Sequence, residues 1–134
     1  MDCIFCKIAE GEIPADKIYE DENCLAFLDI TPVNPGHALL IPKAHYENLH
    51  ELPDELLSKM APVIKKIADA VKKGTDAEGI NIGMNNGEAA GQIVPHAHFH
   101  IIPRFSGDGH KHWKGGSYAE EEAKKTAEKI KLLL

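Results

Sequence analysis

The sequence predicts a single α+β domain built on an antiparallel sheet. Three observations predict this fold class: a strand hairpin near the N-terminus, one long amphipathic helix in mid-chain, and two further strands after that helix. Strands that gather before and after a helix, rather than alternating with helices, are typical of antiparallel sheets with segregated helices. The 134 residues show no internal repeat or low-complexity segment, so we expect one domain over 1–134 with helices on one side of the sheet.

The first half of the chain supplies a short helix and three strand patterns. Cys3–Ala9 suits a helix that Glu10 and Gly11 end. The expected strands are apolar runs bounded by turn residues; they are Lys17–Tyr19, Cys24–Asp29 and His37–Ile41.

The second half begins with Pro53–Lys73, which is predicted to be a helix because its apolar residues recur at helical spacing. Pro53 suits the first turn of this helix, and Gly74 suits its end. Two more strands are expected at Gly79–Asn85 and His96–Ile102, with a glycine-bounded loop between them. Ala119–Leu134 is expected to form a charged C-terminal helix with Glu–Lys pairs at i, i+4 spacing, beyond a domain core at 3–113.

Composition excludes several classes of function. A formal net charge of −6 argues against nucleic-acid binding through phosphate neutralisation. No apolar run is long enough for a membrane span or a signal peptide. Three cysteines do not make a disulfide framework in a chain of this size. We therefore expect a cytoplasmic protein with no nucleic-acid and no membrane partner.

The chemistry of the chain centres on His96, His98 and His100, which alternate with Ala97, Phe99 and Ile101. In an extended strand all three imidazoles would line one face, while the apolar residues pack toward a core. An imidazole can act as a nucleophile, a proton shuttle, a phosphate ligand or a metal ligand. Three of the eight histidines in strict alternation favour a functional site over an exposed polar face.

Two neighbouring features extend this candidate site. His37 follows the Pro35-Gly36 turn, and it would place a fourth imidazole at the same end of the sheet. Asn85, Gly91 and Gln92 lie in or beside the loop that precedes the histidine row, and glycine lets backbone N–H groups approach a phosphate closely. Each feature alone also has a purely structural explanation: His37 could simply begin a strand, and the glycine-bounded loop could simply connect two strands.

The pair Cys3 and Cys6 has the spacing of half a tetrahedral zinc site. His45 and one histidine of the row could complete the ligand set. The alternatives are a pair of part-buried thiols and a redox motif, although the βαβ context of thioredoxin-like motifs is missing. Cys24, inside an apolar strand, is most simply a small core residue.

The stretch His96–Ile102 matches the His-φ-His-φ-His-φ-φ signature of the histidine-triad (HIT) superfamily. Ile4–Ile8, Cys24–Ile30, Gly36–Lys43 and the loop from Asn85 to Gln92 also resemble that family, so the similarity runs from about Cys3 to Trp113. The chain resembles the Hint-like branch, particularly its small prokaryotic members with an N-terminal Cys-x-x-Cys.

The resemblance implies an α+β fold with a five-stranded antiparallel sheet, a long helix and a C-terminal helix. It also implies a homodimer whose sheets join across the interface. The implied activity is hydrolysis or transfer at the α-phosphate of nucleotide conjugates through a covalent nucleotidyl-histidine. The implied ligand is therefore a purine nucleotide or nucleotide conjugate.

The resemblance implies a role for each matching residue. His98 would be the nucleophile, the carbonyl of His96 would fix its tautomer, and His100 and His37 would sit near the phosphate oxygens. Asn85, Gly91 and Gln92 would bind phosphate, and Asp29 would bind the ribose hydroxyls. The residues expected around the base are Phe5, Ile8, Phe27, Ile30 and Leu39.

In relatives with the cysteine pair, zinc is held by positions that match Cys3, Cys6, His45 and His96. The resemblance thus implies one structural zinc ion per chain, with all four coordination positions filled. One departure is Ile93, which stands where many Hint-like hydrolases carry a phosphate-contacting Ser. Trp113 resembles a C-terminal Trp that borders the partner's site in eukaryotic relatives.

The sequence thus predicts a histidine-triad nucleotide hydrolase, with purine nucleoside phosphoramidates or related AMP conjugates as substrates. A dinucleoside polyphosphate hydrolase or a nucleotidylyltransferase is the alternative among enzymes. A nucleotide-binding or interaction protein with weak catalysis is the alternative of another class, favoured by Ile93 and opposed by the intact triad.

Overall fold

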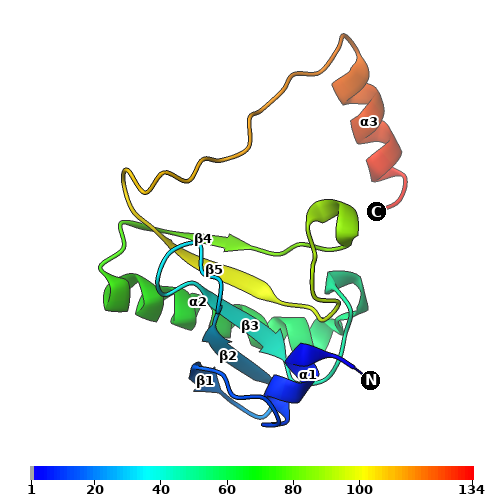
Figure 1. Ribbon diagram of the computed structural model, residues 1–134. Coiled ribbons are helices and arrows are strands. Elements are labelled where there is room, and N and C mark those ends of the chain that lie inside the picture. The colour runs from blue at the N-terminus through cyan, green and yellow to red at the C-terminus, as the bar shows by residue number, and fades with distance from the viewer. Residues whose placement is uncertain (1) are drawn as a thin grey trace.

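The apolar runs of the sequence become the strands of one antiparallel sheet in the computed structural model, which describes residues 2–134 (Figure 1). The sheet has five strands in the order β1-β2-β3-β5-β4, and each neighbouring pair is antiparallel. This confirms the predicted α+β fold class. The strands are β1 (Lys17–Glu20), β2 (Cys24–Leu28), β3 (Ala38–Pro42), β4 (Gly79–Gly83) and β5 (Phe99–Arg104).

The helices are α1 (Ile4–Ala9), α2 (Asp54–Thr75) and α3 (Glu122–Lys131), with short 3-10 turns η1 (Leu49–Glu51) and η2 (Glu88–Ala90). Cys3 caps α1 by accepting a hydrogen bond from the Cys6 amide through its sulfur. Helix α2 runs one residue past Gly74 and ends where Asp76 adopts a left-handed conformation with φ 56°. Helix α3 is shorter at both ends than the predicted 119–134.

One face of the sheet packs against α2. Met60, Ile67 and Val71 of this helix lie in one buried cluster with the side chains of Cys24, Ala26, Ala38, Leu40 and Ile101. These strand residues share a face because successive side chains of a strand point to opposite sides.

The other face is covered near one end by α1, so the expectation that helices lie on one side only was wrong. Phe5 and Ile8 of α1 pack with Leu25, Phe27 and Leu39. His100 stands opposite Leu39 in the β3–β5 pairing and therefore projects toward the face that α1 covers. This places the short N-terminal helix beside the histidine-bearing strand.

Strand β5 begins later than the sequence predicted. The expected strand starts at His96, but the ladder starts at Phe99: the chain bends at residues 94–96, and residues 97 and 98 lie outside the ladder. The reason is local hydrogen bonding: the Ala97 amide donates to the Tyr46 carbonyl at 2.7 Å, and the His96 amide donates to the Val94 carbonyl at 2.8 Å. The three histidines therefore do not form one row on a regular strand.

Beyond β5 the chain leaves the sheet. Residues 109–134 are exposed throughout, and α3 stands apart from the rest of the molecule (Figure 1). Within residues 2–134, none of the helices has the length and apolar character that crossing a bilayer requires.

Candidate active site and metal centre

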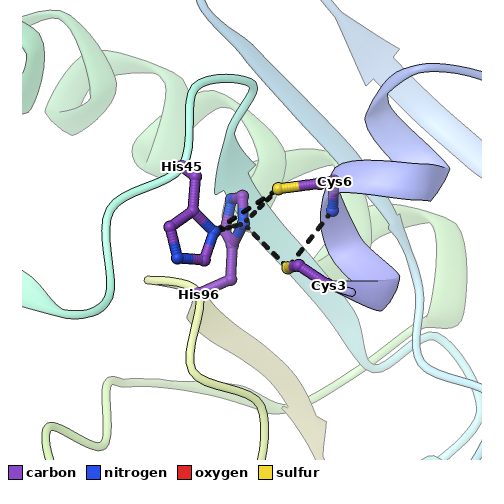
Figure 2. Close-up of side chains that lie close together, drawn as sticks. All are labelled: Cys3, Cys6, His45 and His96. Atoms are coloured by element: carbon purple, nitrogen blue, oxygen red, sulfur yellow. Dashed lines mark hydrogen bonds between the residues drawn. The ribbon is translucent and has the colours of Figure 1, made fainter. Parts of the chain in front are cut away.

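Cys3, Cys6, His45 and His96 come together at one end of the sheet. Their ligand atoms all lie within 4.8 Å of one another. Figure 2 shows the two thiols reaching from α1 toward the imidazoles of His45 and His96, which come from separate loops. The sequence prediction of this quartet as one group agrees with the structure.

The distances in this cluster are those of a coordination shell. A tetrahedral zinc ion, with bonds of about 2.3 Å to sulfur and about 2.0–2.1 Å to nitrogen, sets its ligand atoms roughly 3.3–3.8 Å apart. The Cys3 Sγ and Cys6 Sγ atoms each lie 3.5 Å from His96 Nδ1. His45 Nδ1 lies 3.4 Å from Cys6 Sγ and 3.2 Å from His96 Nδ1. Two thiols and two imidazoles in this arrangement can hold a metal ion.

The protonation of these groups also suits a metal. His96 Nε2–H donates to the Pro42 carbonyl at 2.8 Å, which leaves Nδ1 as a lone-pair donor facing the thiols. Burial lowers the pKa of His96 and keeps its ring neutral. Burial also raises the pKa of the Cys6 thiol to about 11, so a cation is needed to hold this thiolate at neutral pH.

The backbone of His96 connects the metal cluster to His98. His98 Nδ1–H donates to the His96 carbonyl at 2.7 Å. This bond fixes the proton on Nδ1 and leaves the Nε2 lone pair free to attack. The ring of Phe5 lies edge-on to both imidazoles, 5.9 Å from His96 and 5.2 Å from His98 between centroids. Helix α1 therefore supports both rings.

His98 and His100 open into a cavity of about 410 Å³. This volume lies in the range of sites for small organic ligands. Eight of the nine residues predicted for substrate binding line it: Phe5, Ile8, Phe27, Asp29, Ile30, Leu39, Asn85 and Gly91. Phe5, Ile8, Phe27 and Leu39 come from α1, β2 and β3 and form an apolar wall that suits a flat base.

Gln92 is the predicted residue that does not line the cavity. Its side chain instead braces the loop: Oε1 accepts from the Gly87 amide at 2.8 Å, and Nε2 donates to the carbonyls of Glu47 and Val94. Gly91, with φ 93°, then turns the chain close to Asn85. Gln92 thus acts on the shape of the loop.

His37 also lies behind the cavity wall rather than in it. Its Nε2 is 2.9 Å from His100 Nδ1 and 3.7 Å from Asp29 Oδ2. Burial lowers the pKa of His37, and burial with the neighbouring imidazoles lowers the pKa of His100 to about 4. Both rings are therefore neutral at physiological pH and interact with an anion as N–H donors.

Several lining residues escaped the sequence prediction. Ile13, Pro14 and Ala15 line the cavity, although Ile13 and Pro14 read only as a turn signal after α1. Val94 lines it too and, like Ile13 and Ala15, packs against the apolar cluster of Phe5 and Phe27, whereas the side chain of Ile93 is 91% exposed. The resemblance had already marked Ile93 by its position two residues after Gly91, whereas the other residues lie in turns and loops that carry no periodicity to mark them.

The chain is similar to known proteins over most of its length. The family model for the HIT domain matches residues 10–107. An uncharacterised HIT-like protein of Methanocaldococcus jannaschii is 56% identical over 107 residues, which are 80% of this chain and 82% of that protein. An adenosine 5'-monophosphoramidase of Schizosaccharomyces pombe is 49% identical over 104 residues, which are 78% of this chain and 75% of that protein.

The similarity extends to solved structures. A Zn-bound histidine triad family protein from Mycobacterium smegmatis matches with a TM-score of 0.78 and 42% identity. The match covers 98% of this chain and 96% of that one.

Proposed function

The chain belongs to the HIT domain family, and we propose that it hydrolyses purine nucleotide conjugates at the α-phosphate, with nucleoside phosphoramidates as the leading substrates. The observation that carries this proposal is the hydrogen bond from His98 Nδ1–H to the His96 carbonyl. It fixes a proton on Nδ1 and leaves Nε2 of the same ring without a protein partner at the wall of a cavity of about 410 Å³.

In the proposed first step, the His98 Nε2 lone pair forms a bond to the α-phosphorus while the bond from phosphorus to the leaving nitrogen breaks. The positive charge that develops on the His98 ring is stabilised by the His96 carbonyl, which already accepts its Nδ1–H. The leaving amine takes up a proton from solvent as it departs. Water then forms a bond to the phosphorus while the phosphorus–Nε2 bond breaks, which releases the nucleoside monophosphate and His98, and the proton lost by the water returns to solvent.

The remaining site residues would bind the ground state and the developing charge. His100 would donate its Nε2–H to a phosphate oxygen, beside the amide of Asn85 and the backbone at Gly91. The Asp29 carboxylate, held through Oδ1 by the amide and hydroxyl of Thr31, would accept from the ribose hydroxyls. Phe5 and Phe27 would pack against the base.

The relatives support a phosphoramidate as the substrate. The Schizosaccharomyces pombe relative is named an adenosine 5'-monophosphoramidase, and this chain shares 49% identity with it.

We also propose that Cys3, Cys6, His45 and His96 hold one structural zinc ion. The donor set and its spacing support zinc, since two thiolates and two imidazoles are a common tetrahedral set. When bound, the ion would tie α1 to the loop of His96 and so hold the carbonyl that orients His98. Two reduced thiols at this centre are consistent with the expected cytoplasmic setting.

The activity is tested with His98→Ala. We expect this variant to lose at least about 10³-fold in turnover of adenosine 5'-phosphoramidate, because it removes the nucleophile. His50→Ala is the matched control, since His50 is an exposed imidazole in η1, and it should keep wild-type activity. Diadenosine tetraphosphate, assayed in parallel, separates a phosphoramidase from a polyphosphate hydrolase. The enzyme proposal fails when wild type turns over neither substrate faster than His98→Ala.

The metal is tested by measuring zinc in the purified protein by mass spectrometry. We expect about one zinc per chain in wild type and far less in Cys6→Ser, which loses one of four ligands. Cys24→Ser is the control, because Cys24 is buried in β2 outside the cluster. Equal zinc in Cys6→Ser and Cys24→Ser would contradict the proposed ligand set.

A further inference from the structure

A network of hydrogen bonds follows β5, outside the cavity. The Asp108 carboxylate accepts from Arg104 Nε at 2.8 Å and from Arg104 Nη2 at 3.1 Å. It also accepts from the backbone amides of Phe105 and His110. The Arg104 guanidinium and these amides hold the pKa of Asp108 well below its usual range, so the carboxylate stays ionised. The turn 104–110 is therefore a rigid unit.

This turn is attached to the loop that precedes His37. Asn34 Nδ2 donates to the Pro103 carbonyl at 2.9 Å and to Asp108 Oδ2 at 3.0 Å. His110 Nε2 lies 3.0 Å from the Val33 carbonyl and donates to it. Two side chains thus connect residues 33 and 34 with the end of β5, although the two segments are far apart in the sequence.

The loop held in this way decides which nitrogen of His37 carries the proton. The Val33 amide donates to His37 Nδ1 at 3.0 Å, so Nδ1 must be bare and Nε2 must carry the proton. His37 Nε2–H then donates to His100 Nδ1 at 2.9 Å. Consequently His100 carries its own proton on Nε2, the nitrogen that remains for the ligand in the cavity.

The opposite arrangement would be harmful to an enzyme of this kind. If the Val33 amide moved away, His37 could protonate Nδ1 and accept from His100 Nδ1–H. His100 would then present a bare lone pair to the phosphate instead of an N–H donor. The backbone amide of Val33 therefore controls, in both His37 and His100, which ring nitrogen donates and which accepts.

We propose that Asn34 and His110 are positioning residues that hold the Val33 amide against His37 and thereby keep His100 in its donor tautomer. This inference rests on the proposed function, because it assigns these residues a part in the same reaction. They act through His37 and His100 and do not touch the substrate.

The test combines a structural and a kinetic measurement on the double variant Asn34→Ala/His110→Ala. It removes both side-chain ties and leaves the Arg104–Asp108 pair intact. The matched control is Asn81→Ala/His112→Ala: Asn81 accepts from Arg104 Nη1 at 2.7 Å without touching the loop, and His112 is exposed in the same C-terminal segment as His110. Urea unfolding of all three proteins checks that each is folded.

Long-range proton–nitrogen NMR of protein labelled with ¹⁵N-histidine reports which ring nitrogen carries the proton, with His37→Gln used for assignment. In wild type we expect His37 and His100 as Nε2–H tautomers. In the double variant both rings should shift toward an average of the two tautomers. The kcat on adenosine 5'-phosphoramidate should fall about tenfold with little change in KM, since the lost donor acts mainly in the transition state.

Unchanged His37 and His100 tautomers in the double variant would overturn the inference, whether or not kcat falls. An equal tautomer shift or loss of kcat in the Asn81→Ala/His112→Ala control would overturn it as well. A wild-type protein without turnover defeats the proposed function instead, while the NMR comparison still decides the role of Asn34 and His110.

Discussion

At the scale of single residues, the site depends on where each histidine keeps its proton. Three backbone groups make this choice: the Pro42 carbonyl for His96, the His96 carbonyl for His98 and the Val33 amide for His37. As a result, chemically identical side chains are suited to different proposed roles: His96 to metal binding, His98 to nucleophilic attack and His37 to fixing the tautomer of His100.

Histidine 100 should make folding stability depend on pH in a defined window. Burial, with His98 and His37 nearby, lowers its pKa from 6.5 to about 4 in the folded state. Between these values the unfolded chain binds a proton that the folded chain does not, so the free energy of unfolding decreases as pH falls from 6.5 toward 4. His100→Gln removes this contribution, and urea unfolding of both proteins at half-unit pH steps should show a flatter dependence for the variant.

Titrating groups remote from His100 are present in both proteins and cancel, so the difference between the curves reports His100 together with its coupling to His98 and His37. Above pH 7 the two curves should run parallel, because His100 is then neutral in both states. Parallel curves below pH 6.5 as well would show that His100 is not held neutral by the fold.

The residue types of the site, and the carbonyl that fixes the tautomer of His98, could be read from the sequence through the family resemblance, but the tautomers of His37 and His100 could not. His98, Asp29 and Asn85 were assigned from motif position, and the structure brings them to one cavity. The Gln92 side chain had been expected at the phosphate, yet it braces the loop through the Gly87 amide and two carbonyls. Backbone partners of this kind depend on chain segments that meet only in the fold.

At the scale of elements, the turn before β3 is a demanding point in the chain. Gly36 has φ 100°, and a Cβ there would lie 2.5 Å from Thr75 Cγ2 at the end of α2. Gly36→Ala should therefore lower the free energy of unfolding by about 2–4 kcal/mol, from left-handed strain and steric overlap together. Gly11→Ala is the matched control, because Gly11 has φ 82° in open space and should cost only about 1 kcal/mol.

A double-mutant cycle separates the two causes. Thr75→Ser removes the methyl group that the new Cβ would strike, so it should recover part of the loss in Gly36→Ala but not the backbone strain. Chemical denaturation of the four proteins gives the coupling energy. If Gly36→Ala and Gly11→Ala lower the free energy of unfolding equally, the contact between the new Cβ and Thr75 of α2 does not contribute to the loss.

Elements with a clear hydrophobic periodicity were predicted well. The segment whose backbone follows the contacts of the site, at residues 96–98, was not. The strands β2 and β3 and the helix α2 follow apolar runs and helical spacing that the sequence displays openly. The strand predicted from His96 does not begin there because the His96 side chain turns toward Cys3 and Cys6, and the Ala97 amide donates a hydrogen bond to the Tyr46 carbonyl. Alternation alone cannot reveal such a competing partner.

At the scale of the whole molecule, the described chain offers two sheet edges and one exposed segment to a partner. Strands β1 and β4 are the edges of the sheet, and an edge strand offers free backbone groups to another chain. The segment 109–134 is exposed along its length, including Trp113 and the apolar end of the chain at Leu132, Leu133 and Leu134. Exposed apolar groups of this kind are typical of surfaces that bind a partner.

These regions support the predicted homodimer, with β4 as the edge at which two sheets join. Sedimentation should give a mass of about 29 kDa, twice the 14.7 kDa of one chain. Ile82→Lys places a charge on β4 and should convert the protein to monomers, because a lysine on an edge strand opposes pairing. Ile18→Lys is the matched control: Ile18 lies on β1, the opposite edge, and both isoleucines are 46% exposed. If Ile18→Lys breaks the dimer and Ile82→Lys does not, the interface lies on β1 and the prediction of β4 is wrong. A monomeric wild type would exclude the dimer itself.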